Sequence, residues 1–274
     1  MPVDLHVHTT ASDGVLTPSE VVCTAVAADL SAIAITDHDT TDGLDEALAA
    51  GAGGRTAVLS GVELSVDEKT GSDVHVLGLL VDHRDYGLAG ALAGLRLERE
   101  ERAATMVAAL AAAGHPIDLE SVKAIAGSGS IGRVHVARAL VAAGSAPSIE
   151  AAFRLLIGRD APFYFRKRTL SAAEAIDAIH GAGGVAVLAH PGVSGESAFP
   201  VLLSAGIDGI EAFHAEHSVA DQGRFARLAA KHGLLVTGGS DFHAPDVRSA
   251  PIGGGGCPEG AVEALRLRAR RYRS

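Results

Sequence analysis

The stretch VDLHVH at residues 3–8 alternates apolar and polar side chains in the pattern of a β-strand, and a short loop carries the chain on to Asp13. Side chains alternate across a strand, so His6 and His8 point to the same side. Two imidazoles roughly 6–7 Å apart on one strand face can converge on a single ion. Asp13 can return from the loop as an oxygen ligand of a neighbouring ion. The alternative is a surface strand with two solvated histidines and an ordinary turn aspartate.

The composition predicts a globular protein of the cytoplasm. Hydrophobic residues make up 47% of the 274, yet no apolar run reaches the roughly 18 residues that a membrane span needs. The amino terminus lacks a basic segment followed by an apolar one, so we expect no signal peptide. Cys23 and Cys257 are far apart in the sequence, which favours a reducing compartment over a disulfide framework. We expect Cys23 in the core, no membrane partner and no obligate protein partner.

Charge is distributed unevenly along the chain. The formal net charge is −10, but residues 131–168 hold seven basic and two acidic residues, a local balance of +5. A basic region of this kind favours an anionic ligand. Its densest part, RKR at residues 166–168, is compatible on charge alone with a phosphate-binding loop or with a solvated loop.

Apolar runs of strand length alternate with amphipathic helices at both ends of the chain. Capping boxes at Thr17 and Ser171 predict helix starts. The expected strands cover residues 3–8, 32–36, 56–66, 74–81, 184–189, 209–213 and 234–237, and the expected helices 17–29, 43–50, 171–182, 219–232 and 258 onward. The arginines that end the last helix are expected to be solvated. The middle is rich in alanine, leucine and arginine without an evident strand. We therefore predict an α/β barrel formed by residues 1–86 and 171–274, with a helical insertion at 87–170 that forms a lid.

Histidines and carboxylates gather where the predicted strands end. Imidazole and carboxylate are ligands of zinc, manganese and iron, and this set is too large for one ion. We expect two or three divalent metals at the carboxyl-terminal mouth of the barrel. The residues are His6, His8, Asp13, Asp37, His38, Glu63, His75, His190, Asp241 and His243.

The motifs around these residues resemble those of the PHP (polymerase and histidinol phosphatase) family, and they occur in the family's order. They read HVHT at 6–9, SDG at 12–14, TDHD at 36–39, GVE at 61–63, HVLG at 75–78, AHP at 189–191 and GSDFH at 239–243. The resemblance implies a distorted (β/α)7 TIM-like barrel with a trinuclear metal site. For a mixed site rich in carboxylates we expect manganese first, with iron or zinc as alternatives.

Carried over by position, the resemblance assigns each ligand to a metal. His6, His8, Glu63 and Asp241 would hold the first metal. Asp13, His38 and His243 would hold the second. Glu63 would bridge to a third, completed by His75 and His190. Asp37 would orient a ligand histidine, and Asp13, His38, Asp241, His243 and Arg133 form the predicted catalytic set.

The segment GRVHVAR at residues 132–138, together with the helical insertion, is similar to one branch of the family. That branch contains nucleoside 3′,5′-bisphosphate phosphatases and enzymes that trim short RNA from its 5′ end. Its members usually have proline where this chain has Val134. We predict that Arg133 and His135 hold the substrate. A cation from Arg166, Lys167 or Arg168 would bind a second phosphate, and the aromatic residues at 163–165 would stack on a base.

His214 follows a predicted strand at the same mouth. It is either a substrate-site residue that donates a proton to the leaving oxygen or a buried structural histidine.

The expected reaction is hydrolysis of the 3′-phosphate of a nucleoside 3′,5′-bisphosphate by a hydroxide that bridges two metals roughly 3.5–4 Å apart. The expected partner is thus a small phosphoester or the 5′ end of a short RNA. Three alternatives remain at this point: a 5′–3′ exoribonuclease of short oligoribonucleotides, a histidinol-phosphate phosphatase, and a non-catalytic metal-binding module that docks to a polymerase-like partner.

Overall fold

The strands form one sheet that bends almost into a closed barrel. The computed structural model describes residues 2–67, 73–166, 169–193, 195–245 and 250–273. The order along the sheet is β1-β2-β3-β4-β6-β7-β8, and the short β5 pairs with β3. The bounds are β1 Val3–Val7, β2 Ala32–Ile35, β3 Ala57–Asp67, β4 Asp73–Leu79, β5 Leu170–Ser171, β6 Val185–Leu188, β7 Gly209–His214 and β8 Leu235–Gly239.

The segment that follows β8 returns to β1 and nearly closes the barrel. The backbone amide of His8 donates to the carbonyl of Phe242 at 3.0 Å, and the amide of Asp241 donates to the carbonyl of His6 at 2.9 Å. The predicted TIM-like barrel is confirmed.

One strand runs against the others. β4 pairs antiparallel with both β3 and β6, whereas the other neighbouring pairs are parallel. Antiparallel neighbours need only a short connection, and no helix separates β3 from β4 in the sequence. Ser65 lies opposite His75 in this pairing, so Glu63 and His75 share one face of the sheet. The reversed strand thereby brings a histidine and a glutamate together.

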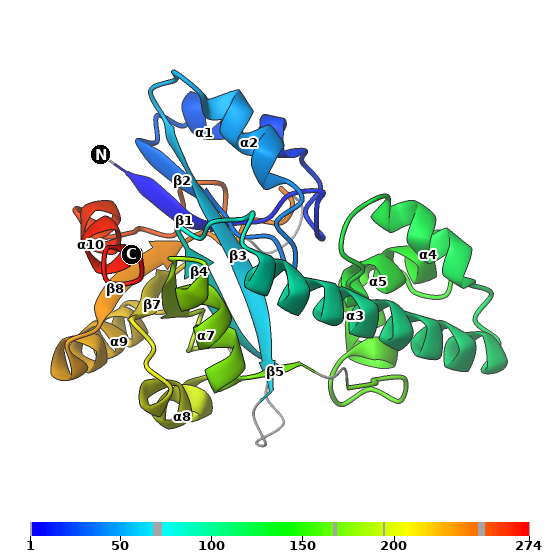
Figure 1. Cartoon of the computed structure of the whole chain (residues 1–274). Coiled ribbons are helices and arrows are strands. Elements are labelled where there is room, and N and C mark those ends of the chain that lie inside the picture. Colours follow the sequence, from blue (N-terminus) through cyan, green and yellow to red (C-terminus); the bar gives the residue numbers. More distant parts are fainter. Residues whose placement is uncertain (1, 68–72, 167–168, 194, 246–249, 274) are drawn as a thin grey trace.

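Helices cover the outside of the barrel (Figure 1). Their bounds are α1 Pro18–Ala27, α2 Leu44–Gly51, α7 Ala172–Gly181, α8 Phe199–Ser204, α9 Val219–His232 and α10 Ala261–Ala269. The largest hydrophobic cluster packs Ile176 and Phe225 of these helices against Leu64 and Val76 of the strands. Both predicted capping boxes are present, at Thr17 and Ser171. Helix α8 and the single turn before it, Glu196–Ala198, were not expected, because six residues are too few to establish a helical period.

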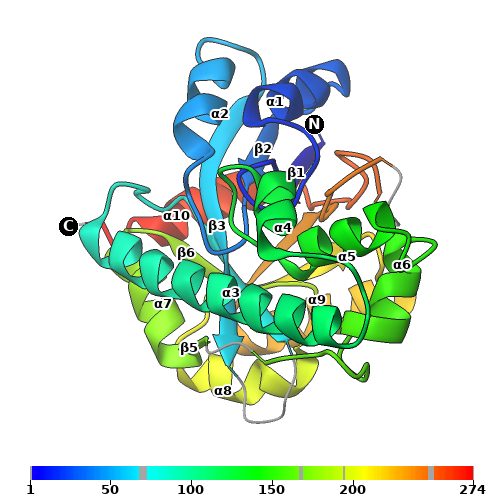
Figure 2. The ribbon, with the colours of Figure 1, turned by 90° about the vertical axis from the view of Figure 1, so that its right-hand side faces the viewer.

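The middle of the chain forms helices beside the barrel mouth. They are α3 Tyr86–Ala112, α4 Leu119–Ala126, α5 Arg133–Ala142, α6 Ile149–Ala152 and the π-helical turn Phe153–Ile157. The first half of α3 packs into the barrel's cluster through Leu88, Leu92 and Leu95. Figure 1 shows α3 extending away from the sheet with α4 and α5 beside it, and Figure 2 shows the same helix crossing the front of the molecule. These helices have their own hydrophobic cluster, in which Met106, Leu110 and Leu140 are fully buried.

The last helix is held by side chains that we expected to be solvated. Arg268 and Tyr272 each bond Oδ1 of buried Asp208 at 2.8 Å, while His180 bonds Oδ2 at 2.8 Å. Arg273 donates to the carbonyls of Gly183 and Leu80. The expectation of a solvated helix end is therefore wrong for Arg268 and Arg273, because their partners lie far away in the sequence.

Two expectations about environment have different outcomes. Cys23 is exposed and not in the core, because the buried face of α1 is formed by Val21, Val22 and Ala25 instead. Among the described residues, no helix combines the length and the apolar character needed to span a membrane.

We predict that Asp208→Ala lowers the free energy of unfolding by about 3 kcal/mol and the Tm by roughly 5–10 °C, because it leaves Arg268 partly buried without its carboxylate. Thermal unfolding followed by circular dichroism measures this change. Arg84→Ala, which removes an ion pair with Asp45 from a side chain that is 75% exposed, is the control and should leave the Tm nearly unchanged. Equal shifts for the two variants would contradict the prediction.

Candidate metal centre

The predicted ligands lie together at the mouth of the barrel. Three groups of side chains could each hold a metal ion: His6, His8, Glu63 and Asp241; His8, Asp13, His38 and His243; and His38, Glu63 and His75. Within each group, the donor atoms lie within 4.8 Å of one another. The groups share members, so they form one continuous cluster.

The first group consists of the four residues predicted for the first metal. Nε2 of His6 lies 3.1 Å from Nε2 of His8, and these two atoms lie 3.4 and 3.3 Å from Oε2 of Glu63. Oδ1 of Asp241 is 3.3 Å from the His6 atom and 3.0 Å from the His8 atom. An ion about 2.1 Å from each donor would leave them about 3.0–3.4 Å apart. The spacing therefore fits a first-row divalent metal.

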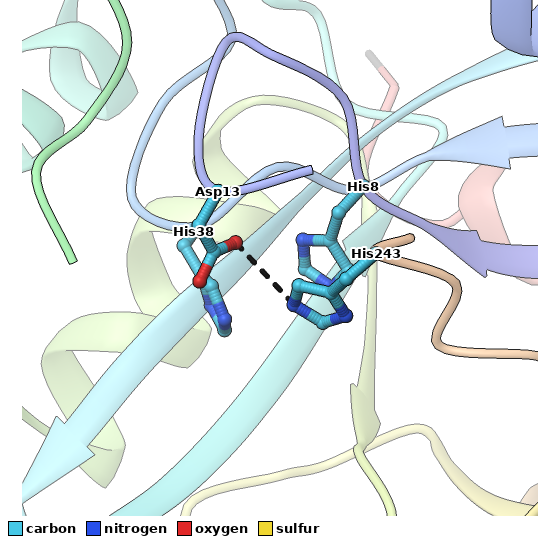
Figure 3. A group of neighbouring side chains, drawn as sticks. All are labelled: His8, Asp13, His38 and His243. Atoms are coloured by element: carbon cyan, nitrogen blue, oxygen red, sulfur yellow. Dashed lines mark ion pairs between the residues drawn. The ribbon is translucent and has the colours of Figure 1, made fainter. Parts of the chain in front are cut away.

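The second group contains the predicted Asp13, His38 and His243, and also His8. Figure 3 shows the carboxylate of Asp13 turned toward the rings of His38 and His243, with the pair Asp13–His243 at 3.3 Å. Burial would raise the pKa of Asp13, but His243 and His38 beside it hold that pKa well below its usual range. The Asp13 carboxylate is therefore anionic at neutral pH, as a metal ligand would need to be.

The third group differs in one member from the predicted set. Nδ1 of His75 and Nε2 of His190 lie 2.9 and 3.0 Å from the same oxygen of Glu63, Oε1. However, the group whose donor atoms lie within 4.8 Å of one another contains His38, Glu63 and His75, and not His190. His38 Nδ1 lies 2.9 Å from the other oxygen of Glu63, Oε2. Glu63 thus lies between the three groups, as expected for a bridging ligand.

Unpartnered buried atoms support metal binding at this cluster. Nδ1 of His38 and Oε2 of Glu63 are 2.9 Å apart, yet neither has a hydrogen-bond partner among the described residues. The same holds for Nδ1 of His75, Oδ1 of Asp13 and Oδ1 of Asp241. Buried polar atoms normally have partners. Lone pairs that face one another at this distance are satisfied by a shared cation.

Burial and the carboxylates of the cluster act in opposite directions on its histidines, and burial prevails at His38, where it lowers the pKa to about 4. Burial alone would lower the pKa of His8, but the carboxylates of Asp241 and Glu63, which lie 3.0 and 3.3 Å from its Nε2, raise that pKa to about 10. Burial would raise the pKa of Glu63, and His38, His75 and His6 lower it well below its usual range. Without a metal, protons therefore balance the buried carboxylates, and a metal must displace them.

A glutamate that the sequence did not single out supports two of the predicted ligands. Both oxygens of Glu211, fully buried on β7, lie 3.1 and 3.2 Å from Nδ1 of His6. One of them also accepts the backbone amide of His190 at 2.8 Å, where His190 has a positive φ of 25°. A carboxylate on the far nitrogen of a ligand histidine fixes the orientation of the ring. Glu211 lies within an apolar strand and belongs to no recognisable motif, so the sequence did not predict its role.

Asp37 does not orient a ligand histidine, so that expectation is wrong. Its carboxylate accepts the amide and hydroxyl of Thr9 and the hydroxyl of Ser12, at 2.8, 2.7 and 2.6 Å. Asp37 therefore shapes the loop that carries Asp13.

A pocket of about 100 Å³ lies beside the metal cluster. It is lined by Asp13, His38, His75, Arg99, Arg102, Gly132, Arg133, Val134 and Phe153. The guanidinium of Arg133 lies 5.6 Å from the centre of the Phe153 ring and 5.4 Å from that of Tyr164. The pocket joins predicted metal ligands to a cation held against aromatic faces.

His135 is buried behind this pocket. Its Nδ1 accepts the amide of Gly132 at 2.9 Å. Burial lowers the pKa of His135 to about 4, so the ring is neutral at pH 7. The structure thus places Arg133, and not His135, at the pocket surface.

The remaining predicted substrate residues do not line this pocket among the described residues. Arg166 is exposed. Lys167 and Arg168 lie outside the described residues. His214 is buried, with Nε2 3.4 Å from Oδ2 of Asp241, and its Nδ1 accepts the amide of Glu216 at 3.2 Å.

Known proteins share this fold and sequence over nearly the whole chain. A 3′,5′-nucleoside bisphosphate phosphatase of Chromobacterium violaceum is 39% identical, with 92% of this chain and 90% of that protein covered. A 5′–3′ exoribonuclease of Haemophilus influenzae is 34% identical, with 88% and 90% covered. A crystal structure from Bifidobacterium adolescentis, assigned as a metal-dependent phosphoesterase, superposes with a TM-score of 0.88 at 32% identity and covers 98% of both chains.

The PHP domain family model matches residues 4–118, a range that contains six of the nine predicted ligands. The relative of Chromobacterium violaceum extends the match to 92% of the chain, and the structure from Bifidobacterium adolescentis extends it to 98%. Together with the metal cluster, these matches show that the chain belongs to the PHP family.

Proposed function

We propose that this protein removes the 3′-phosphate from nucleoside 3′,5′-bisphosphates. The protein is a metal-dependent phosphoesterase, a hydrolase that acts on phosphoester bonds. The observation that carries the finer assignment is the pocket in which Arg133 faces the predicted ligands Asp13, His38 and His75. A substrate with one phosphate at the metals and a second nearby matches this combination. The relative of Chromobacterium violaceum supports the same substrate class.

We further propose that the three groups of donors hold two or three metal ions, preferably manganese, with iron or zinc as alternatives. Mixed carboxylate and imidazole ligands suit all three ions. Divalent metals at this cluster would lower the pKa of a water and neutralise charge on the phosphoryl group.

The protein's own residues bind and orient the substrate. Arg133 can bind two phosphate oxygens with its planar guanidinium, and its contacts with Phe153 and Tyr164 reduce the number of conformations open to it. Tyr164 also offers a ring face for a nucleobase. Arg166, Lys167 or Arg168 would supply the cation for the second phosphate. His214 would give its proton to the leaving 3′ oxygen.

A 5′–3′ exoribonuclease activity is the second candidate. The relative of Haemophilus influenzae supports it, and the bond that breaks is a 3′-phosphoester in both reactions. A histidinol-phosphate phosphatase fits less well, because its substrate has no second phosphate for the cations at the pocket. Rates of phosphate release from adenosine 3′,5′-bisphosphate, 5′-AMP and histidinol phosphate separate the phosphatase functions, and release of mononucleotides from a short oligoribonucleotide tests the exoribonuclease. Equal rates on all three small substrates would contradict the bisphosphate assignment.

We predict that Arg133→Ala lowers kcat/KM for adenosine 3′,5′-bisphosphate by about 10–100-fold, because a charge-assisted contact with phosphate is lost. Steady-state kinetics and metal analysis of the same preparation measure the two effects. Metal content should stay at the wild-type value, and its loss would show that Arg133 belongs to the metal site. Arg154→Ala, an exposed arginine of the same basic region, is the matched control.

We predict that Asp13→Ala reduces the bound metal by one equivalent, because the second group loses its only carboxylate. Inductively coupled plasma mass spectrometry after dialysis gives the metal content. Asp160→Ala, an exposed carboxylate in the basic region, should keep the full content. If the Asp13 variant keeps its metal and its activity, Asp13 is a turn residue only.

We predict that metal binding at pH 7 releases at least one proton. The pKa of His8 is about 10 in the metal-free protein, so its ring is protonated at pH 7 and must lose that proton to bind. The apparent Kd for Mn²⁺ should fall about tenfold per pH unit for each proton displaced. Calorimetric titration in two buffers of different ionisation enthalpy counts the protons, and a binding enthalpy independent of the buffer would refute the prediction.

A further inference from the structure

Arg99 is a buried arginine of α3 that contacts the barrel. It is 5% exposed, and its Nε donates to Oδ2 of Asp39 at 2.5 Å. Asp39 follows the predicted ligand His38 directly and has a positive φ of 52°. The Asp39 carboxylate also accepts the amide and hydroxyl of Ser65 on β3, at 2.8 and 3.0 Å. Asp39 therefore joins the loop after β2 to the strand that carries Glu63.

The other nitrogens of the same guanidinium reach both sides of the pocket. One Nη donates to the hydroxyl of Ser65 and the other to the carbonyl of Ile131, each at 3.4 Å. Ile131 stands directly before Gly132 and Arg133. A Cβ on Gly132 would lie 3.6 Å from Arg99 and 3.4 Å from the Asp13 carboxylate. The turn at residues 131–133 therefore packs between Arg99 and a predicted metal ligand.

We propose that Arg99 is a positioning residue, which sets the place of the substrate-binding turn at residues 131–133 relative to the metal ligands. It does so with one rigid fork that contacts Asp39, Ser65 and Ile131. The inference rests on the proposed binding of substrate by Arg133. The bond to Asp39 fixes the guanidinium of Arg99 on the barrel. Its contact with Ile131 then holds the turn that carries Arg133 at the pocket.

Lysine at position 99 separates charge balance from positioning. A lysine ammonium can still neutralise buried Asp39, but it has one nitrogen and no planar fork. Arg99→Lys should therefore keep most of the stability and metal content, while the contact with Ile131 is lost. Arg99→Met should in addition lose stability, because it removes the guanidinium that donates to the buried carboxylate of Asp39.

The chain also offers a matched control on the same helix. Arg96, three residues earlier, pairs with Asp42 at 2.5 Å, and their side chains are 37% and 57% exposed. This pair also links α3 to the loop after β2, but it does not line the pocket. Arg96→Met removes a helix-to-loop ion pair without touching the turn at residues 131–133.

The first measurement is kinetic. We expect Arg99→Lys to lower the ratio of kcat/KM for adenosine 3′,5′-bisphosphate to that for phenyl phosphate by about tenfold, mainly through KM of the bisphosphate. Arg96→Met should keep the wild-type ratio. If Arg99→Lys loses metal and both activities fall equally, Arg99 supports the metal ligands only and the proposal is overturned.

The second measurement does not depend on the substrate. The chain has no tryptophan, so Tyr164→Trp, beside Arg133, introduces a single fluorescent reporter. In that background, we expect Arg99→Lys to raise the acrylamide quenching constant by at least half, and Arg96→Met to leave it unchanged. Unchanged quenching in Arg99→Lys overturns the positioning role. If quenching changes but the wild-type enzyme does not prefer the bisphosphate, the positioning role stands and the proposed substrate is wrong.

Discussion

The carboxylate of Glu63 is the constraint on which the rest of the site depends. It is fully buried, and five histidines surround it: His6, His8 and His38 near one oxygen, and His75 and His190 near the other. These histidines come from β1, β4 and the ends of β2 and β6. An unpaired buried charge costs several kcal/mol. Cations, as metals or as protons, must therefore balance Glu63 in the closed barrel, so a metal that binds here would compete with protons.

The sequence predicts which side chains converge at the barrel mouth because they occur in short local motifs at strand ends. His6 and His8, or Asp241 and His243, lie two residues apart, and such spacing is visible without a structure. Glu211 and Arg99 have no such neighbours. Each is one polar residue in an ordinary strand or helix, and its role comes from partners far away in the chain, which no local pattern encodes.

Orientation is a second property that the sequence does not contain. The apolar pattern of residues 74–81 identifies a strand, but it gives no direction, so the antiparallel pairing of β4 appears only in the structure. The polar partners of Asp37 are hidden in the same way. The position of Asp37 beside histidine motifs suggests a role at a metal ligand. In the structure its carboxylate instead accepts hydrogen bonds from Thr9 and Ser12. Charge and spacing in the sequence predict the types of side chain at the site. The role of each residue depends on its contacts in three dimensions.

The helices beside the barrel have a hydrophobic cluster of their own, and this has a consequence for how such an enzyme diversifies. Met106 and Leu140 belong to that cluster and not to the cluster of the barrel, so we expect substitutions at these residues to act mainly within the helices. Sequence drift in these helices can change the residues that line the substrate pocket, while purifying selection preserves the residues of the candidate metal centre. This architecture therefore favours the evolution of paralogues that differ in substrate but keep the same catalytic residues in the barrel.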